Sequence, residues 1–240
     1  MIEIVCHRGA NEYAPENTYA SSEICIDWGA DFLEIDINTS RDGIPYLFHG
    51  PDLSRTTNGS GKIYEHDSSI LDQLDCGSWF SNKFSAERIP RLDEFLAWID
   101  RRIKLFLDVK WADLQLIRQL IYEHDMQDNC FFWFGRNKFA HELHALDSSL
   151  DLKINVSSTK EVVQAKELYG ASIVEFSLQD ASQEMISTCR ELDVRSMILY
   201  KTNDVDGFRR IIKSGADMVN LDHADHFLKV LKDDGTIDHT

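Results

Sequence analysis

The sequence predicts an α/β protein folded as a (β/α)8 TIM barrel. From residue 104 onward, short apolar runs rich in β-forming residues recur with centres near residues 107, 132, 154, 175, 198 and 220. The steps of 21 to 25 residues between them fit a strand, a loop and an amphipathic helix. Two earlier runs, 3–6 and 31–37, bring the parallel-type strands to eight. Eight such units favour a closed barrel, with a doubly wound open sheet as the alternative.

Amphipathic segments separate these strands. The first, at 16–29, lies between the two amino-terminal strands and ends in glycine. Five more carry apolar residues at helical spacing, and two of them end in a glycine that stops a helix. These five segments are 112–125, 138–149, 159–170, 182–193 and 205–215.

One apolar run, 44–50, breaks the alternation. It follows the second strand after only Arg41, Asp42 and Gly43, which is too short for a crossover between parallel strands, so it is predicted to return antiparallel. If Asp42 and Gly43 are the central residues of a two-residue turn, Asp36 lies directly opposite His49. The stretch at about 51–90 lacks the βα rhythm and is predicted to be a small insertion within a single domain, 1–240.

Composition limits the classes of partner. The chain has 240 residues, 43% of them hydrophobic, and 25 basic against 41 acidic residues give a net charge of −16. Such a charge disfavours nucleic acid and anionic membranes as partners, so any phosphate site must be local. Five dispersed cysteines without a CxxC indicate neither a disulfide framework nor a zinc site, and a reducing cytoplasm fits best. We see no export signal and no membrane anchor, and oligomeric state is not predicted.

Acidic side chains gather where strands should end. Glu34 and Asp36 are two apart on one strand and share a face, and Asp108 and Lys110 repeat that spacing on the next. Two acids on one face of a buried strand are costly unless they are paired or bind a cation. Carboxylate oxygens suit one hard divalent ion, Mg²⁺ or Ca²⁺. In a barrel these residues lie at the carboxyl ends of the strands, where active sites form.

Basic groups surround the same predicted site. His7 and Arg8 follow the first strand, and Lys110 follows Asp108. Together with a divalent ion they would make a positive pocket inside an acidic protein. We therefore predict a phosphate site.

Several linked motifs carry a family resemblance. The chain resembles the glycerophosphodiester phosphodiesterases in "HRG", "APENT", "LEID", "RDGIPYLFHG" and "LSRTTNGSG", in order and at the family's spacing. The resemblance is strong over 4–61, moderate to about 110, and weaker but consistent in strand layout beyond. It implies a TIM-barrel hydrolase that converts a small-molecule glycerophosphodiester to sn-glycerol 3-phosphate and an alcohol, without stable membrane association.

The resemblance also implies roles for single residues. His7 and His49 would be the general acid/base pair, in an order that stays open, and Arg8 would contact the phosphate with Lys110 beside it. Glu34 and Asp36 would bind the metal, with Asp108 where the family usually has Glu. The attacking group is either water or the glycerol's own hydroxyl. Glu16 and Asn17 either start the first helix or, as the family places them, lie at the rim of the site that binds the substrate.

Some positions depart from the family's pattern. Gly50 replaces the usual Asp after the second histidine, and Tyr200 and Lys201 stand where the family has Trp and Thr. Tyr200 either stacks on substrate or closes the barrel, and Lys201 is a candidate second cation for an additional acidic group. Two other functions stay open: a lysophospholipase D-like or phosphoglycan-directed phosphodiesterase, and a catalytically silent glycerophosphodiester-binding barrel.

Overall fold

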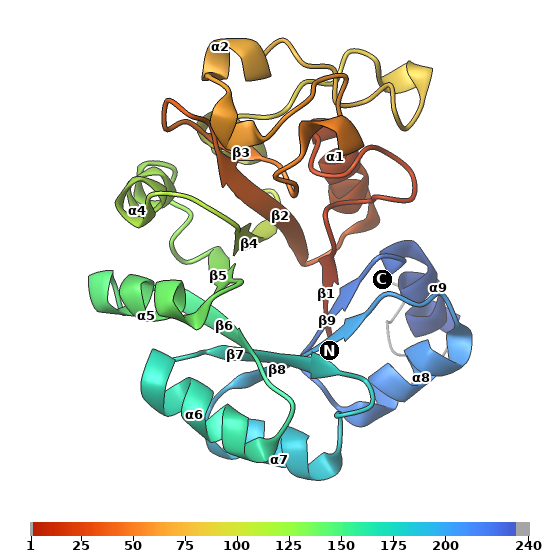
Figure 1. Ribbon diagram of the computed structural model, residues 1–240. Helices are drawn as coiled ribbons and strands as arrows, with labels where there is room; N and C mark the ends of the chain where they lie inside the picture. The colour runs from red at the N-terminus through yellow and green to blue at the C-terminus, as the bar shows by residue number, and fades with distance from the viewer. Residues whose placement is uncertain (1, 234–240) are drawn as a thin grey trace. The chain divides into compact units, whose positions relative to one another are not determined.

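The predicted barrel is present. The computed structural model describes residues 2–233, and its strands pair in the order β1-β9-β8-β7-β6-β5-β4-β2-β3, with β1 also paired to β2 (Figure 1). Eight parallel strands therefore form a closed TIM barrel, and β3 is an extra antiparallel strand outside it. The strands are β1 (Glu3–Cys6), β2 (Phe32–Thr39), β3 (Pro45–Leu47), β4 (Lys104–Val109), β5 (Cys130–Phe134), β6 (Asp151–Asn155), β7 (Ile173–Ser177), β8 (Arg195–Tyr200) and β9 (Met218–Leu221).

The helices are α1 (Tyr19–Trp28), α2 (Ser68–Leu71), α3 (Leu92–Ile99), α4 (Leu114–Glu123), α5 (Asn137–Leu146), α6 (Thr159–Tyr169), α7 (Gln183–Glu191), α8 (Val205–Ser214) and α9 (Ala224–Asp233). The six segments predicted to be helical correspond to α1 and α4 to α8, whereas α2, α3 and α9 were not predicted. Gly170 and Gly215 adopt left-handed backbone angles and end α6 and α8, as the sequence indicates.

The described chain divides into two compact units. One holds residues 2–6, 30–32 and 131–233, and the other holds 7–29 and 33–130. In the first unit, α5 to α8 lie on the outside of the strands that they connect, and α9 follows the last strand, β9 (Figure 1). The second unit carries β3, β4 and the segment predicted to be an insertion. That the whole of 1–240 is a single domain stays a prediction.

A buried ion pair lies among the strands of the first unit. Lys153 on β6 is 2% exposed, and its Nζ donates to Glu175 Oε2 on β7 at 2.5 Å. The second Glu175 oxygen accepts a 3.4 Å hydrogen bond from the Asn220 amide on β9, and Lys153 Nζ lies 4.7 Å from the Trp133 ring centroid. A single acid within an apolar strand is therefore neutralised by a lysine from the neighbouring strand.

The hairpin after β2 has a different register from the predicted one. The pairs are Ile37 with Leu47, Asn38 with Tyr46 and Thr39 with Pro45, so Asp36 is opposite Phe48 and not His49. Phe48 N–H donates to Asp36 O at 2.9 Å, in agreement with this register. The loop has three residues between Ser40 and Ile44, because Gly43 takes φ +89°, the left-handed angle of the wider hairpin loop.

Residues 51–90 build a small hydrophobic core of their own against β3. In the second unit of Figure 1 this segment runs beside β3 through short helical turns and α2. The buried residues of this core, from β3, its end and the inserted segment, are Tyr46, Phe48, Leu53, Ile63, Leu71, Cys76 and Ile89. The segment is therefore packed structure that holds the strand leading to His49.

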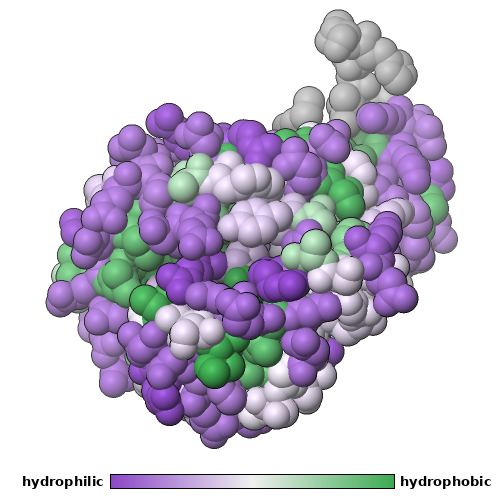
Figure 2. All heavy atoms as spheres, turned by 90° about the horizontal axis from the view of Figure 1, so that it is seen from above, coloured by the Kyte–Doolittle hydropathy of each residue, from purple (hydrophilic) through white to green (hydrophobic). Residues whose placement is uncertain are grey.

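None of the helices within residues 2–233 is long and apolar enough to cross a membrane. On the face shown in Figure 2, apolar side chains are interspersed with hydrophilic ones. All five cysteines are buried, and none of them forms a disulfide bond within residues 2–233.

Candidate active site

The predicted catalytic and metal-binding residues all lie in one unit. His7 and Arg8 follow β1, Glu34 and Asp36 are on β2, and the remaining three come from the ends of β3 and β4. These three are His49, Asp108 and Lys110. The short connection from β2 to β3 and the neighbouring position of β4 bring them together.

Three carboxylates form a compact buried cluster. Glu34, Asp36 and Asp108 each offer an oxygen, all within 4.8 Å of one another, and their exposed fractions are 1%, 0% and 7%. Burial, followed by the charges of Asp36 and Asp108, raises the pKa of Glu34 well above its ordinary value. The cluster therefore needs positive charge close by, and its oxygen donors suit a hard divalent cation.

Side chains and backbone of the same unit hold these acids. Lys110 Nζ lies 3.0 Å from Asp36 Oδ1 and also donates to Asp108, while Arg8 Nε lies 3.4 Å from Asp36 Oδ2. Burial alone would raise the pKa of Asp36, but the charges of Lys110 and Arg8 outweigh it and lower that pKa. Asp36 is therefore ionised and available as a ligand.

The turn after β1 aims a backbone donor at Glu34. Arg8 has φ +59° and Gly9 has φ +81°, and in this conformation Arg8 N–H donates to Glu34 Oε2 at 2.5 Å. A side chain at Gly9 would strain a left-handed residue and place its Cβ 2.5 Å from Ser21 Oγ. The "HRG" motif thus needs its glycine to shape this turn.

His49 is close to Asp36 despite the changed register. The Asn38 amide donates to Phe48 O at 2.9 Å and to Gly50 O at 3.1 Å, which fixes the backbone on both sides of the histidine. Burial lowers the pKa of His49 to about 4, although the charge of Asp36 acts in the opposite direction. The imidazole is therefore neutral at neutral pH.

Gly50 has a steric explanation. A Cβ at this position would lie 2.6 Å from the Phe48 ring and 2.9 Å from the Asp52 backbone nitrogen. The packing of this hairpin leaves no room for the Asp that the family usually carries there.

The segment Glu16-Asn17-Thr18 has three separate roles. Thr18 is the N-cap of α1, and its hydroxyl accepts a hydrogen bond from Ser21 N–H at 3.3 Å. Asn17 hydrogen-bonds to Asp36, and Glu16 pairs with Arg55. The helix begins after Glu16, so Glu16 lies outside it at the rim of the charged cluster.

The sequence did not indicate Arg55 as a site residue, whereas Asn17 was expected with Glu16 either at the helix start or at the rim of the site. Arg55 lies inside "LSRTTNGSG", a motif that carried the family resemblance, and membership of that motif is the signal that could have indicated it.

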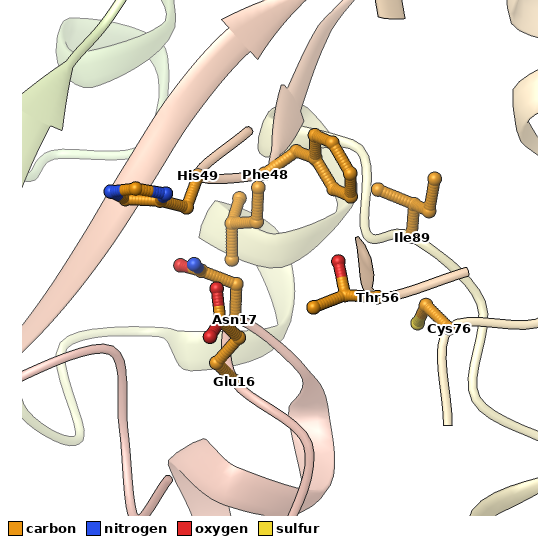
Figure 3. A pocket seen from close by; sticks show the side chains of 8 residues that line it. Glu16, Asn17, Phe48, His49, Thr56, Cys76 and Ile89 are labelled. Carbon is orange, nitrogen blue, oxygen red and sulfur yellow. The ribbon is translucent and has the colours of Figure 1, made fainter. Parts of the chain in front are cut away.

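A small pocket opens beside His49. Figure 3 shows the side chains of Glu16 and Asn17 near His49, with Phe48, Thr56 and Ile89 on the other side of the pocket. Its lining residues are Glu16, Asn17, Leu47, Phe48, His49, Thr56, Cys76 and Ile89. Residues of the hairpin, of the inserted segment and of the loop that holds Glu16 and Asn17 therefore line the same pocket.

Tyr200 and Lys201 belong to the other unit. The Tyr200 hydroxyl donates to Asp204, and its ring packs on Phe208 with centroids 5.9 Å apart, while Lys201 is exposed. These contacts explain how Tyr200 anchors the loop that leads to α8. Substrate contacts by Tyr200 and Lys201 stay predictions.

Comparison with other proteins identifies the family. Residues 7–162 match the model of the glycerophosphoryl diester phosphodiesterase family. The chain belongs to this family. This membership confirms the resemblance found in the sequence and the predicted enzyme class, a phosphoric diester hydrolase.

Solved structures of the phosphodiesterase family share the fold. The glycerophosphodiester phosphodiesterase of Agrobacterium tumefaciens is 31% identical, with a TM-score of 0.91 covering 95% of this chain and 100% of that chain. A phosphodiesterase of Oleispira antarctica, solved in complex with the product sn-glycerol-3-phosphate, is 26% identical with a TM-score of 0.87, covering 96% of each chain.

Curated relatives match to different extents. YhdW of Bacillus subtilis is 38% identical over 107 residues, which are 45% of this chain and 44% of that protein. The matched part therefore spans less than half of that relative. A glycerophosphodiester phosphodiesterase of the same bacterium is 25% identical over 260 residues, covering 95% of this chain and 86% of that protein.

Proposed function

We propose that this protein hydrolyses glycerophosphodiesters to sn-glycerol 3-phosphate and an alcohol, using one divalent cation. The observation that carries the proposal is the meeting of three buried carboxylates with Arg8, Lys110 and His49 in one unit. The sn-glycerol-3-phosphate bound to the Oleispira relative supports this class of substrate.

Glu34, Asp36 and Asp108 would hold the cation. Their oxygens are buried within 4.8 Å of one another. Burial first, and then the charges of Asp36 and Asp108, raise the pKa of Glu34, and a cation would neutralise those charges. Mg²⁺ and Ca²⁺ both prefer oxygen ligands. When bound, such an ion polarises phosphoryl oxygens and lowers the pKa of a coordinated hydroxyl group.

Arg8 and Lys110 would bind the phosphoryl oxygens. Their side chains are 18% and 24% exposed, so each keeps an accessible edge while it pairs with Asp36. Charge on the phosphoryl group grows when the nucleophile attacks, and positioned cations stabilise that state more than the ground state.

The two histidines would move the protons. His49 is neutral near pH 7, which suits it to accept the proton of the attacking hydroxyl group. His7, which follows β1 and is 9% exposed, would then donate a proton to the departing alkoxide. The attacking oxygen comes either from water or from the adjacent glycerol hydroxyl, and only the second route forms a cyclic phosphate.

The decisive experiment measures glycerol 3-phosphate released from glycerophosphocholine and glycerophosphoethanolamine, with and without EDTA. We expect turnover that EDTA abolishes and that Mg²⁺ or Ca²⁺ restores. His49→Ala should lose on the order of 10²-fold to 10⁴-fold in kcat, and exposed His141→Ala should match the wild type. Absence of metal-dependent turnover on any glycerophosphodiester would overturn the proposal, and binding without turnover would indicate the silent barrel.

The proposal also covers the substrate preference and the cellular location of the protein. Lys201 would meet an additional acidic group on the substrate, so Lys201→Ala should change substrate preference. The five buried cysteines, which form no disulfide within residues 2–233, support a reducing cytoplasmic location.

A further inference from the structure

Four charged side chains in the second unit form an alternating series. Arg55 pairs with Glu16, Glu16 lies next to Arg8, and Arg8 lies next to Asp36. The separations differ along the series. Arg55 Nη1 donates to Glu16 Oε2 at 3.0 Å and its Nη2 donates to Oε1, whereas Arg8 Nη1 stays 3.6 Å from Glu16 Oε1.

Glu16 therefore gives both oxygens to Arg55. Such a two-point guanidinium–carboxylate pair is the strongest arrangement these groups form, and it leaves Arg8 only the longer contact. The Nε of Arg8 makes no hydrogen bond to any side chain or backbone group of residues 2–233. The carboxylates of Glu16 and Asp36 therefore attract the Arg8 guanidinium from two sides, but neither forms a close two-point pair with it.

The positions of Glu16 and Arg55 are fixed by their neighbours. Asn17, next to Glu16, is hydrogen-bonded to Asp36, so Glu16 cannot move far from Arg8. Arg55 ends a short helical turn whose Leu53 is 1% exposed in the core of the inserted segment. The inserted segment thus supplies the cation that competes with Arg8 for Glu16.

A carboxylate as buried as Glu16, whose side chain is 12% exposed, pays a desolvation cost that a cation must offset. If Arg55 were neutral, the nearest remaining cation would be Arg8. Glu16 would then pair closely with Arg8 and turn its guanidinium away from an incoming phosphate.

We propose that Arg55 is a positioning residue that occupies Glu16 and thereby keeps Arg8 available for the phosphate group of the substrate. This inference rests on the proposed function, in which Arg8 contacts that phosphate. It differs from direct phosphate binding by Arg55, because its effect depends on the presence of the Glu16 charge.

The test is a double-mutant cycle of Arg55→Gln and Glu16→Gln. The measurements are the dissociation constants of sn-glycerol 3-phosphate and inorganic phosphate by calorimetry, together with kcat and KM for glycerophosphocholine. Arg55→Gln should weaken both ligands on the order of tenfold and lower kcat/KM by at least as much, because Arg8 stabilises the transition state more than the ground state. Glu16→Gln should bind almost as the wild type does, and the double variant should recover most of the lost affinity.

Arg41→Gln is the matched control. Arg41 is also in this unit and also forms a two-point pair, with Asp67 at 2.9 and 2.5 Å, but 62% of its side chain is exposed. We expect unchanged ligand affinity in this variant. Arg55→Lys keeps the charge without the two-point geometry and should fall between the wild type and Arg55→Gln.

Several results would overturn the inference. An equal loss of ligand affinity in Arg55→Gln and in the double variant would show that Arg55 acts on the ligand directly. Unchanged ligand affinity in Arg55→Gln would show that the Arg55–Glu16 pair only links the inserted segment to the loop before α1. If Arg55→Gln does not fold, the same comparison is made with Arg55→Lys and its Glu16→Gln double variant. Ligand binding is measured without turnover, so a protein that binds phosphate but hydrolyses nothing refutes the proposed reaction alone, and one that binds neither ligand refutes both.

Discussion

Asn17 holds Asp36 through both ends of its side-chain amide. Asn17 Nδ2 donates to Asp36 Oδ2 at 2.8 Å, and Asn17 Oδ1 accepts the backbone N–H of Asp36 at 2.9 Å. Both residues are buried, with exposed fractions of 4% and 0%. One residue of the loop before α1 therefore fixes the strand position and the orientation of a predicted metal ligand.

We expect Asn17→Gly to weaken divalent-cation binding on the order of 10-fold to 100-fold, because it removes a partner that orients a metal ligand. Glycine is the suitable replacement since Asn17 has φ +57°, where alanine would add backbone strain. Calorimetric titration of the EDTA-treated protein with Mg²⁺ and Ca²⁺ measures the change.

Asn17→Asp is the second variant for this test of Asn17. It keeps the shape of the side chain but places a further negative charge against Asp36, so it should destabilise the metal-free protein more than Asn17→Gly does. Wild-type metal affinity in both variants would contradict the positioning role of Asn17.

The pKa of His49 predicts a pH-dependent loss of stability. The ordinary pKa of 6.5 falls to about 4 in the folded protein because the imidazole is buried. Between these two values the unfolded chain binds a proton that the folded chain does not, so stability falls as pH drops from 6.5 to 4. The urea midpoint of the metal-free protein should therefore decline over this range more steeply in the wild type than in His49→Gln.

His141→Gln serves as the control for this comparison, since His141 is exposed on α5. It should follow the wild-type curve. Parallel curves for the wild type and His49→Gln would show that burial of His49 does not contribute to the acid sensitivity.

The hairpin shows what sequence could and could not predict about the site. The three-residue step to the 44–50 run indicated an antiparallel return, and β3 confirms it. The register was wrong, because an Asp-Gly pair favours a two-residue turn while the chain forms a three-residue loop. Ser40 stabilises that loop: its hydroxyl donates to Asp42 Oδ1 at 2.7 Å and accepts from Ile44 N–H at 2.9 Å.

Local sequence patterns could not predict ion pairs between residues that are far apart in the sequence. Periodicity predicted the strands of the barrel, and same-face spacing predicted the pairs Glu34 with Asp36 and Asp108 with Lys110. Arg55 reaches Glu16 across 39 positions of sequence, and no periodic signal links them. Such a contact depends on the packing of the inserted segment, which has no regular spacing to interpret.

The five buried cysteines should be unreactive in the folded protein. Burial raises the pKa of Cys76 to about 12 and that of Cys189 to about 11, so almost no thiolate forms near pH 8. We expect less than one fast-reacting thiol per chain with Ellman's reagent in native buffer and five in guanidinium chloride. Rapid reaction of Cys76 in the native protein would contradict the packing of the inserted segment around it.

The ion pair between Lys153 and Glu175 allows a test of how a buried charge pair affects stability. Lys153→Met leaves the Glu175 carboxylate buried without its lysine partner, and we expect a loss of about 3 to 5 kcal/mol in the free energy of unfolding. The double variant Lys153→Met/Glu175→Leu removes both charges and should recover most of that loss, because neither side chain then needs compensation.

Lys138→Met is the matched surface variant for this pair. Lys138 lies 3.5 Å from Glu142 one helical turn away, and 75% of its side chain is exposed, so its loss should change stability by less than about 0.5 kcal/mol. Urea unfolding of all three variants measures the differences. If the double variant were as unstable as Lys153→Met, the cost would lie in lost packing around Lys153, including its contact with Trp133, and not in an uncompensated charge.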